Sequence, residues 1–153
     1  MTVGRLRTVK VIAGLLLAAC LGLGGPARAQ QVSKYGNPWV WVSLGRVTVQ
    51  AEAVRTPARL YLGLSNRRSL PEGQGMLFLM PEKQEQTFCM RGMRFPLDFI
   101  WINKGRVVGI TRNVPPTFGG DLNSPGPVDE VLEVPAGFAQ KYDVKVWDRV
   151  RWW

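Results

Sequence analysis

Residues 75–108, GMLFLMPEKQEQTFCMRGMRFPLDFIWINKGRVV, carry the clearest strand pattern in the chain. Short apolar runs rich in Phe, Ile and Val alternate here with polar turns, a pattern that predicts neighbouring buried strands. Asn103-Lys104-Gly105 separates two of these runs and predicts a hairpin turn, because Gly105 can take a positive φ angle. A single carboxylate, Asp98, lies inside the run that follows Pro96.

The residues on either side of this stretch predict further short strands and two short helices. Thr56-Pro57 favours a helix start, since Thr is a good N-cap and Pro is tolerated at the first helical position. Residues 114–128 contain four prolines and three glycines, so we expect a surface excursion there. Helices are expected over 57–66 and 138–142, and strands over 39–42, 47–52, 76–80, 87–90, 97–103, 106–111, 130–134 and 144–152. The predicted class is α+β, mostly β: a compact, largely antiparallel barrel-like sheet with one or two short helices.

The first 29 residues predict a secretory signal peptide. A basic start, the apolar run 11–25 and the Ala-x-Ala site Ala27-Arg28-Ala29 are its three parts. A competing interpretation is a lipobox, Leu17-Ala18-Ala19-Cys20, whose cysteine would carry a lipid anchor. Both predict export, as a periplasmic or secreted domain or as a lipid-anchored envelope protein. Residues 30–37 are then a flexible leader and residues 38–153 a single domain.

Charge and residue content exclude several classes of function. Residues 1–29 hold four of the 20 basic residues and none of the 11 acidic ones, so their removal lowers the net charge from +9 to +5. The other basic residues are scattered, and we expect no nucleic-acid partner. The sequence has no histidine, which excludes Ser-His-Asp and Cys-His catalysis and His-ligated zinc. We expect no disulfide framework, metal or cofactor.

Asp98 is the leading candidate site residue, because an ionised carboxylate in an apolar strand is costly unless it is paired. One interpretation is structural: backbone N–H groups or an arginine, with Arg59 the first candidate, satisfy it. The other is a perturbed carboxylate at a cleft. Arg91, Pro96 and Met90 complete the candidate ligand-binding or buried polar site, and we assign no catalytic residue.

Four other features have a structural interpretation and a functional one. Glu133 is expected on a solvated strand face. Cys89 lacks a histidine to activate it and is expected to be buried and inert. The methionines could suit a soft metal, but we expect them to fill gaps in the core. Phe99 and Trp101 share one face of their strand and Ile100 the other, so one face is core and the other is covered or is a binding groove.

Six short motifs follow one another along the chain: Arg59–Leu64, Arg68–Pro71, Gly75–Phe78, Phe88–Arg91, Pro96–Ile100 and Leu132–Gly137. Their order and spacing resemble the uncharacterised bacterial and archaeal family called domain of unknown function 192, over about residues 47–152. Two departures are visible: Cys89 stands where the family usually has tryptophan, and Arg91-Gly92-Met93 stands where Lys-Asn-Thr is common. The resemblance implies a small β-rich domain, exported or membrane-tethered, and no established activity.

Three functions remain open from the sequence. The first is a non-enzymatic envelope domain that binds a ligand or a partner protein, favoured because no nucleophile–base pair is visible. An accessory structural domain that stabilises an envelope assembly has the same sequence features as this first one. The alternative is a hydrolase or lyase that uses Asp98 with Arg59 or Arg91 in a cleft. The ligand or partner in the envelope is unknown in each case.

Overall fold

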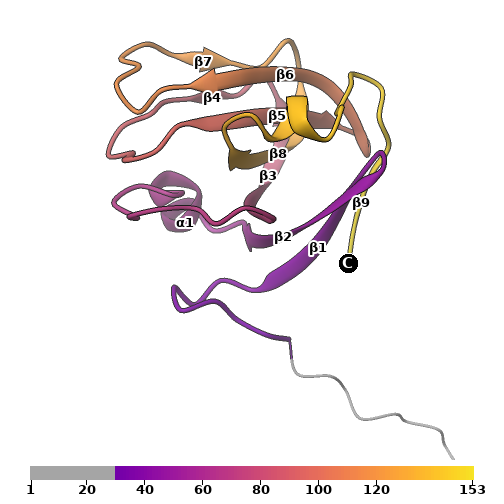
Figure 1. Ribbon diagram of the computed structural model, residues 1–153. Helices are drawn as coiled ribbons and strands as arrows, with labels where there is room; N and C mark the ends of the chain where they lie inside the picture. The colour runs from indigo at the N-terminus through magenta and orange to yellow at the C-terminus, as the bar shows by residue number, and fades with distance from the viewer. Residues whose placement is uncertain (1–29) are drawn as a thin grey trace, which may run out of the picture.

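The computed structural model describes residues 30–153 and has a mostly β fold with two short helices (Figure 1). The predicted signal peptide and the lipid anchor at Cys20 lie outside these residues. Among the residues described, no helix is long and apolar enough to cross a membrane. In chain order the elements are β1 (Trp39–Leu44), β2 (Val47–Val54), α1 (Pro57–Leu62), β3 (Gln74–Gln84), β4 (Thr87–Phe88), β5 (Leu97–Asn103), β6 (Arg106–Val114), β7 (Leu122–Asn123), β8 (Val128–Pro135), α2 (Phe138–Lys141) and β9 (Val150–Trp152).

Seven strands form one half-barrel sheet in the order β6-β5-β8-β3-β2-β1-β9, and β4 pairs separately with β7. Within the large sheet β2 and β3 are parallel and the other neighbours are antiparallel. Backbone hydrogen bonds tie its two edges together at one end. The Val107 N–H donates to the Asp148 carbonyl at 3.0 Å, and the Trp147 N–H donates to the Val107 carbonyl at 2.8 Å. The predicted barrel-like, largely antiparallel sheet is confirmed.

Both faces of the central strands are covered. Alternation along β5 places Ile100 and Ile102 on one face and Phe99 and Trp101 on the other, and all four are buried. The first pair belongs to a core cluster inside the half-barrel, and the second to a cluster on the outer face. The buried side chains on either face of these strands are therefore packed in one of the two core clusters and shielded from water.

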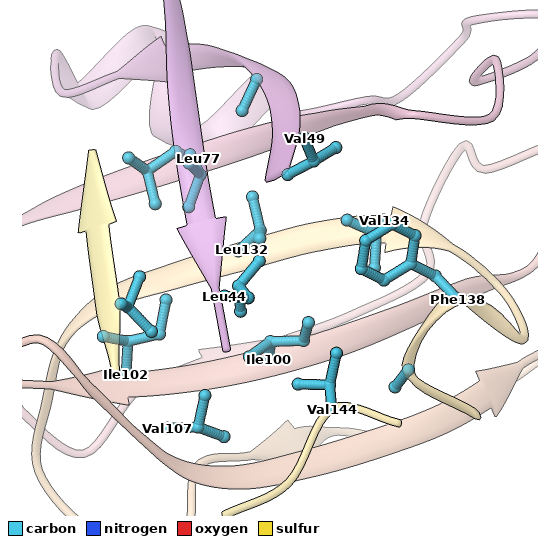
Figure 2. Packing of buried hydrophobic residues seen from close by; sticks show 14 of the residues in the cluster. Leu44, Val49, Leu77, Ile100, Ile102, Val107, Leu132, Val134, Phe138 and Val144 are labelled. Atoms are coloured by element: carbon cyan, nitrogen blue, oxygen red, sulfur yellow. The ribbon is translucent and has the colours of Figure 1, made fainter. Parts of the chain in front are cut away.

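Helix α2 closes the inner core cluster. Figure 2 shows Leu44, Leu132 and Ile100 near the middle of this cluster, with Phe138 of α2 beside Val134. Phe138 is only 4% exposed, although it belongs to a helix of four residues. Burial of large side chains, each worth roughly 1.5–3 kcal/mol, is the main source of stability here.

Local geometry explains where the sequence predictions hold and where they fail. The hairpin turn is confirmed, with φ angles of 49° at Lys104 and 66° at Gly105. Helix α1 is shorter than predicted because Gly63, with φ 49°, ends it after Leu62. Residues 144–149 do not continue a strand, and β7 lies inside the segment predicted to contain no sheet. That short strand fits between the prolines of the segment because it has only two residues.

Candidate functional site

Asp98 is an internal anchor. Its side chain is fully buried, and its carboxylate accepts three backbone N–H groups: from Asn113 at 2.8 Å, Gly137 at 3.2 Å and Ala139 at 2.9 Å. Two of these donors belong to the first turn of α2, where a carboxylate replaces the missing helical partners. Asp98 thus ties β5 to β6 and α2, as the backbone-bonded interpretation predicts.

The prediction that Arg59 pairs with Asp98 is wrong. Arg59 instead donates a hydrogen bond to the Tyr35 carbonyl oxygen at 2.6 Å. Arg91 stacks its guanidinium on the Tyr61 ring, 4.7 Å from the ring centre. Neither residue bonds Asp98 among residues 30–153. Without exposure to solvent or a cationic partner, Asp98 lacks the cleft geometry that a hydrolase or lyase would need.

Neither of the two other candidate residues forms a hydrogen bond with the Asp98 carboxylate among residues 30–153. Met90 is 2% exposed and belongs to the outer core cluster. Pro96 is exposed, and its carbonyl oxygen accepts the Ala136 N–H at 3.2 Å. The structure therefore does not assemble the five predicted residues into one site.

A cavity of about 450 Å³ lies elsewhere, on the outer face of the sheet. Its walls are α1 with the loop that follows, the end of β3, and the segment from β4 to Met93. We call it the Glu133 pocket, since Glu133 is its one lining residue from β8. Its lining residues are Leu60, Tyr61, Leu62, Gly63, Leu64, Ser65, Phe78, Met80, Pro81, Gln84, Gln86, Thr87, Phe88, Cys89, Arg91, Met93 and Glu133.

Glu133 does not lie where the sequence predicted. It lies between Met76 of β3 and Phe99 of β5 in the strand register, and it is only 5% exposed. Its Oε2 atom is buried and has no hydrogen-bond partner. Burial raises the pKa of Glu133 from 4.5 to about 8, although the positive charge of Arg67 acts in the opposite direction. The prediction that Glu133 lies on a solvated strand face is wrong, and its burial favours the protonated carboxyl at neutral pH.

A second buried carboxylate, Glu52, lies near Glu133 in the same row of the sheet. Met76 is the register neighbour of both residues, so about 10 Å separates their backbones. Glu52 forms a two-pronged ion pair with Arg67, with N–O distances of 2.5 and 3.0 Å. Burial alone would raise the pKa of Glu52, but the hydrogen bonds from Arg67, Asn37 and Ser33 hold it below its usual value. Glu52 is therefore satisfied, whereas Glu133 is not.

The segment expected to be a flexible leader contributes to this ion pair. Ser33 and Asn37 are buried and donate to the Glu52 carboxylate at 2.9 and 2.7 Å. The Tyr35 ring stacks on the Arg67 guanidinium at 3.8 Å. Residues 33–37 are thus attached to β2, next to the wall of the Glu133 pocket.

Comparison with known proteins identifies the family. The model of the DUF192 family, described as "Uncharacterized ACR, COG1430", matches residues 40–152. The chain belongs to the DUF192 family. No curated protein matches it.

Two solved structures resemble the DUF192 domain described here. A protein of unknown function from Novosphingobium aromaticivorans is 32% identical with a TM-score of 0.77, over 82% of this chain and 94% of that one. A protein from Sinorhizobium meliloti, described as "a putative transcription regulator", is 29% identical with a TM-score of 0.73, over 79% of this chain and 96% of that one. The fold is therefore shared with both, and neither description gives a ligand or a reaction.

The pocket of this DUF192 domain combines apolar walls with a few polar groups. Phe78 and Phe88 meet edge to face, with ring centres 5.0 Å apart. Cys89, expected to be buried, is instead exposed as a free thiol on the pocket lining. Arg91 is also exposed and lines the pocket, so we place it at the rim. Among residues 30–153, no group of three His, Cys, Asp or Glu side chains is placed to hold a metal ion.

Proposed function

We propose that this DUF192 domain binds a small, mainly apolar ligand that presents a hydrogen-bond acceptor to Glu133. The observation that carries the proposal is the buried Glu133 carboxyl, which lines a cavity and has an oxygen without a partner. A cavity of about 450 Å³ lies within the range of small-molecule sites, which are typically apolar with a few polar groups.

The placement of Glu133 costs folding stability. A buried polar group without a partner costs about 1–3 kcal/mol, and a leucine of similar size would avoid that cost. Glu133 is in the middle of a strand whose neighbours Leu132 and Val134 are core residues. A residue that lowers the stability of the fold and lies beside a cavity is typically functional. A ligand with a carbonyl or hydroxyl oxygen would supply the missing partner.

Nearby charges select the kind of ligand. Protonated Glu133 can donate a hydrogen bond, so an acceptor on the ligand fits it. Arg67 acts on Glu133 electrostatically, and Arg91 lines the same pocket. Because Arg67 is paired with Glu52, the Arg91 guanidinium is the charge that disfavours a cationic ligand and tolerates a neutral or anionic one. The ligand class is therefore apolar, uncharged or anionic, with an oxygen acceptor.

The same geometry supports binding rather than catalysis. Asp98 is sealed by three backbone N–H groups, so it cannot reach a substrate. The export pattern of residues 1–29 supports a place for this binding function in the envelope, either as a soluble or as a lipid-anchored protein.

The experiment compares three eight-carbon probes by isothermal titration calorimetry at pH 6.5: 1-octanol, octanoate and octylammonium. We expect octanol and octanoate to bind the unaltered chain and octylammonium to bind at least tenfold more weakly. Glu133→Leu should bind octanol at least fivefold more weakly, while Glu133→Gln, which keeps a donor, should retain binding. Glu82→Gln, an exposed change on β3, is the matched control. Equal binding of octanol to the Leu variant and the unaltered chain would overturn the role of Glu133.

Cys89 offers an independent readout of occupancy. In a chain with Cys20→Ser, Cys89 is the single remaining thiol, and it lines the pocket. Octanol should slow its reaction with a bulky disulfide reagent. An unchanged rate at saturating octanol would place the probe outside the pocket and contradict the proposal.

A further inference from the structure

Exposed tryptophans gather at the C-terminal end of the domain. The sequence has six tryptophans, of which Trp101 is a core residue. In contrast, Trp41 is 47% exposed, Trp147 69% and Trp153 65%. Indoles are large apolar groups, and water-exposed ones in a small domain mark an interaction surface more often than chance placement.

These tryptophans lie on the C-terminal segment 147–153 and on β1, the strand that pairs with its end. Trp153 and Trp41 exchange backbone hydrogen bonds of 3.0 and 3.1 Å, and Arg151 lies opposite Ser43 in the same ladder. Just before β9, the Arg149 carbonyl oxygen accepts the Gly45 N–H at 3.2 Å. Figure 1 shows this segment running along β1 to the C-terminus. We call the group Trp41, Arg46, Trp147, Arg149, Arg151 and Trp153 the C-terminal strip.

Alternation explains why the strip is exposed. Val150 lies opposite Leu44, and both belong to the inner core cluster. Arg151 and Trp153 must then point away from that core, on the same side as Trp41. Arg46, Arg149 and Arg151 are all exposed. The outer side of this corner of the sheet therefore presents Trp41, Trp153 and Arg151 together, and Arg46, Arg149 and Trp147 are exposed in the adjoining segments.

Trp147 is held in an unfavourable backbone conformation. Its φ angle is 78°, in the left-handed region that bulky residues avoid. Its N–H donates to the Val107 carbonyl, and its own carbonyl oxygen accepts Arg106 Nη1 at 3.1 Å. Strain of this kind commonly accompanies function, and here its result is an indole that is 69% exposed.

We propose that the C-terminal strip docks the domain onto the surface of an anionic membrane. Tryptophan favours the bilayer interface, where its ring is buried among headgroups and its N–H stays hydrated. Arginine pairs well with lipid phosphate, and each basic residue near an anionic surface contributes about fivefold in affinity. Asp148 lies between Trp147 and Arg149, and its carboxylate accepts the Lys145 N–H at 2.8 Å. The three arginines of the strip outweigh this one carboxylate, so the strip is net positive and complements an anionic bilayer. This proposal does not depend on the ligand of the Glu133 pocket.

The test is quenching of tryptophan fluorescence by brominated lipids, which reads only indoles close to the bilayer. Residues 1–29 are left out of the test, because their basic start and apolar run would bind an anionic membrane independently of the strip, and all six tryptophans remain without them. Residues 30–153 are mixed with brominated phosphatidylcholine vesicles, either pure or containing 30% brominated phosphatidylglycerol. We expect quenching with the anionic vesicles, little with the neutral ones, and a loss of quenching as salt is raised.

Variants assign the effect to the strip without removing its indoles. Arg149→Ser with Arg151→Ser should weaken the apparent affinity at least tenfold, whereas the matched exposed pair Arg68→Ser with Arg94→Ser should change it less than twofold. In flotation, Trp153→Ala should release the chain from anionic vesicles, and the exposed control Phe118→Ala should not. Equal quenching by neutral vesicles, or equal loss in both arginine pairs, would overturn the proposal. So would a concentration-dependent dimer that Trp153→Ala dissolves, since the strip would then be a contact between copies.

Discussion

Glu133 should make the domain less stable as pH rises, in contrast to a carboxylate that is paired in the folded state, such as Glu52. Its pKa is raised from 4.5 to about 8 by burial. Below pH 4.5 the carboxyl is protonated in both the folded and the unfolded chain, so the folded state has no disadvantage. Between pH 4.5 and 8 the unfolded chain releases the proton and the folded chain keeps it. The free energy of unfolding therefore falls through this window.

The size of the effect follows from the same shift. Each pH unit inside the window lowers the free energy of unfolding by about 1.4 kcal/mol, so the whole window corresponds to about 5 kcal/mol. Between pH 5 and pH 7.5 the loss is about 3 kcal/mol. This is a large share of the 5–15 kcal/mol that typically stabilises a domain.

Urea unfolding of the unaltered chain and of Glu133→Gln, followed by tryptophan fluorescence from pH 5 to pH 8, measures this effect. The Gln variant cannot ionise at this position, and every other carboxylate contributes equally to both chains. The difference between the two free energies of unfolding isolates Glu133. We expect it to fall by about 3 kcal/mol in the unaltered chain relative to the variant. A difference that is flat, or that rises with pH, would refute a raised pKa and with it the protonated donor in the pocket.

Three further substitutions test the surrounding structure. Arg67→Met should cost about 3–5 kcal/mol in urea unfolding because it leaves Glu52 buried and unpaired, and adding Glu52→Met should recover most of this loss. Asp98→Asn should cost about 3 kcal/mol, since one oxygen that accepts N–H groups becomes a donor, yet the octanol affinity of the folded variant should stay within twofold. Gly75→Ala should cost about 2 kcal/mol, because its Cβ would lie 2.7 Å from the Glu133 carbonyl oxygen; a thermal midpoint equal to that of the unaltered chain would contradict this contact.

Local patterns predicted most of the strands and showed that the Asp98 carboxylate needs partners, because both inferences depend on neighbours in sequence. The turn at Lys104-Gly105 needs positive φ angles, and the run Leu97–Asn103 became β5 with the predicted bounds. The apolar neighbours of Asp98 show that its carboxylate needs partners, and backbone N–H groups supply them. The prediction of Arg59 as a partner is wrong because residue type alone does not show which side chains the folded chain brings close to Asp98.

The burial of Glu133 follows from the prediction that both faces of the neighbouring strand are covered. Both faces of Leu97–Asn103 are apolar, so its neighbours in the sheet must also be covered on both faces. Leu132 and Val134 show that Glu133 lies in a strand, and the covered strand beside it would then exclude water from Glu133. What the sequence could not show is the missing partner, because that depends on where Arg67 lies in the fold. Arg67 is bound to Glu52, a residue 15 positions away in the chain.

Exposure of Cys89 was also beyond local reasoning. Its neighbour Met90 is a core residue, and apolar flanks on both sides predicted burial. Strand β4 is only two residues long and ends at Phe88, so alternation does not extend to Cys89. The thiol is left on the lining of the pocket instead of in the core.

The most direct test of the ligand site is an NMR titration of the Glu133 side-chain carboxyl carbon in ¹³C-labelled protein, with and without 1-octanol. Glu133→Gln identifies the resonance by its disappearance. The structure predicts a midpoint near pH 8 in the free protein. It also predicts a shifted resonance and a still higher midpoint with octanol, because the acceptor binds the protonated form. A midpoint near 4.5 that octanol leaves unchanged would contradict the proposed ligand site.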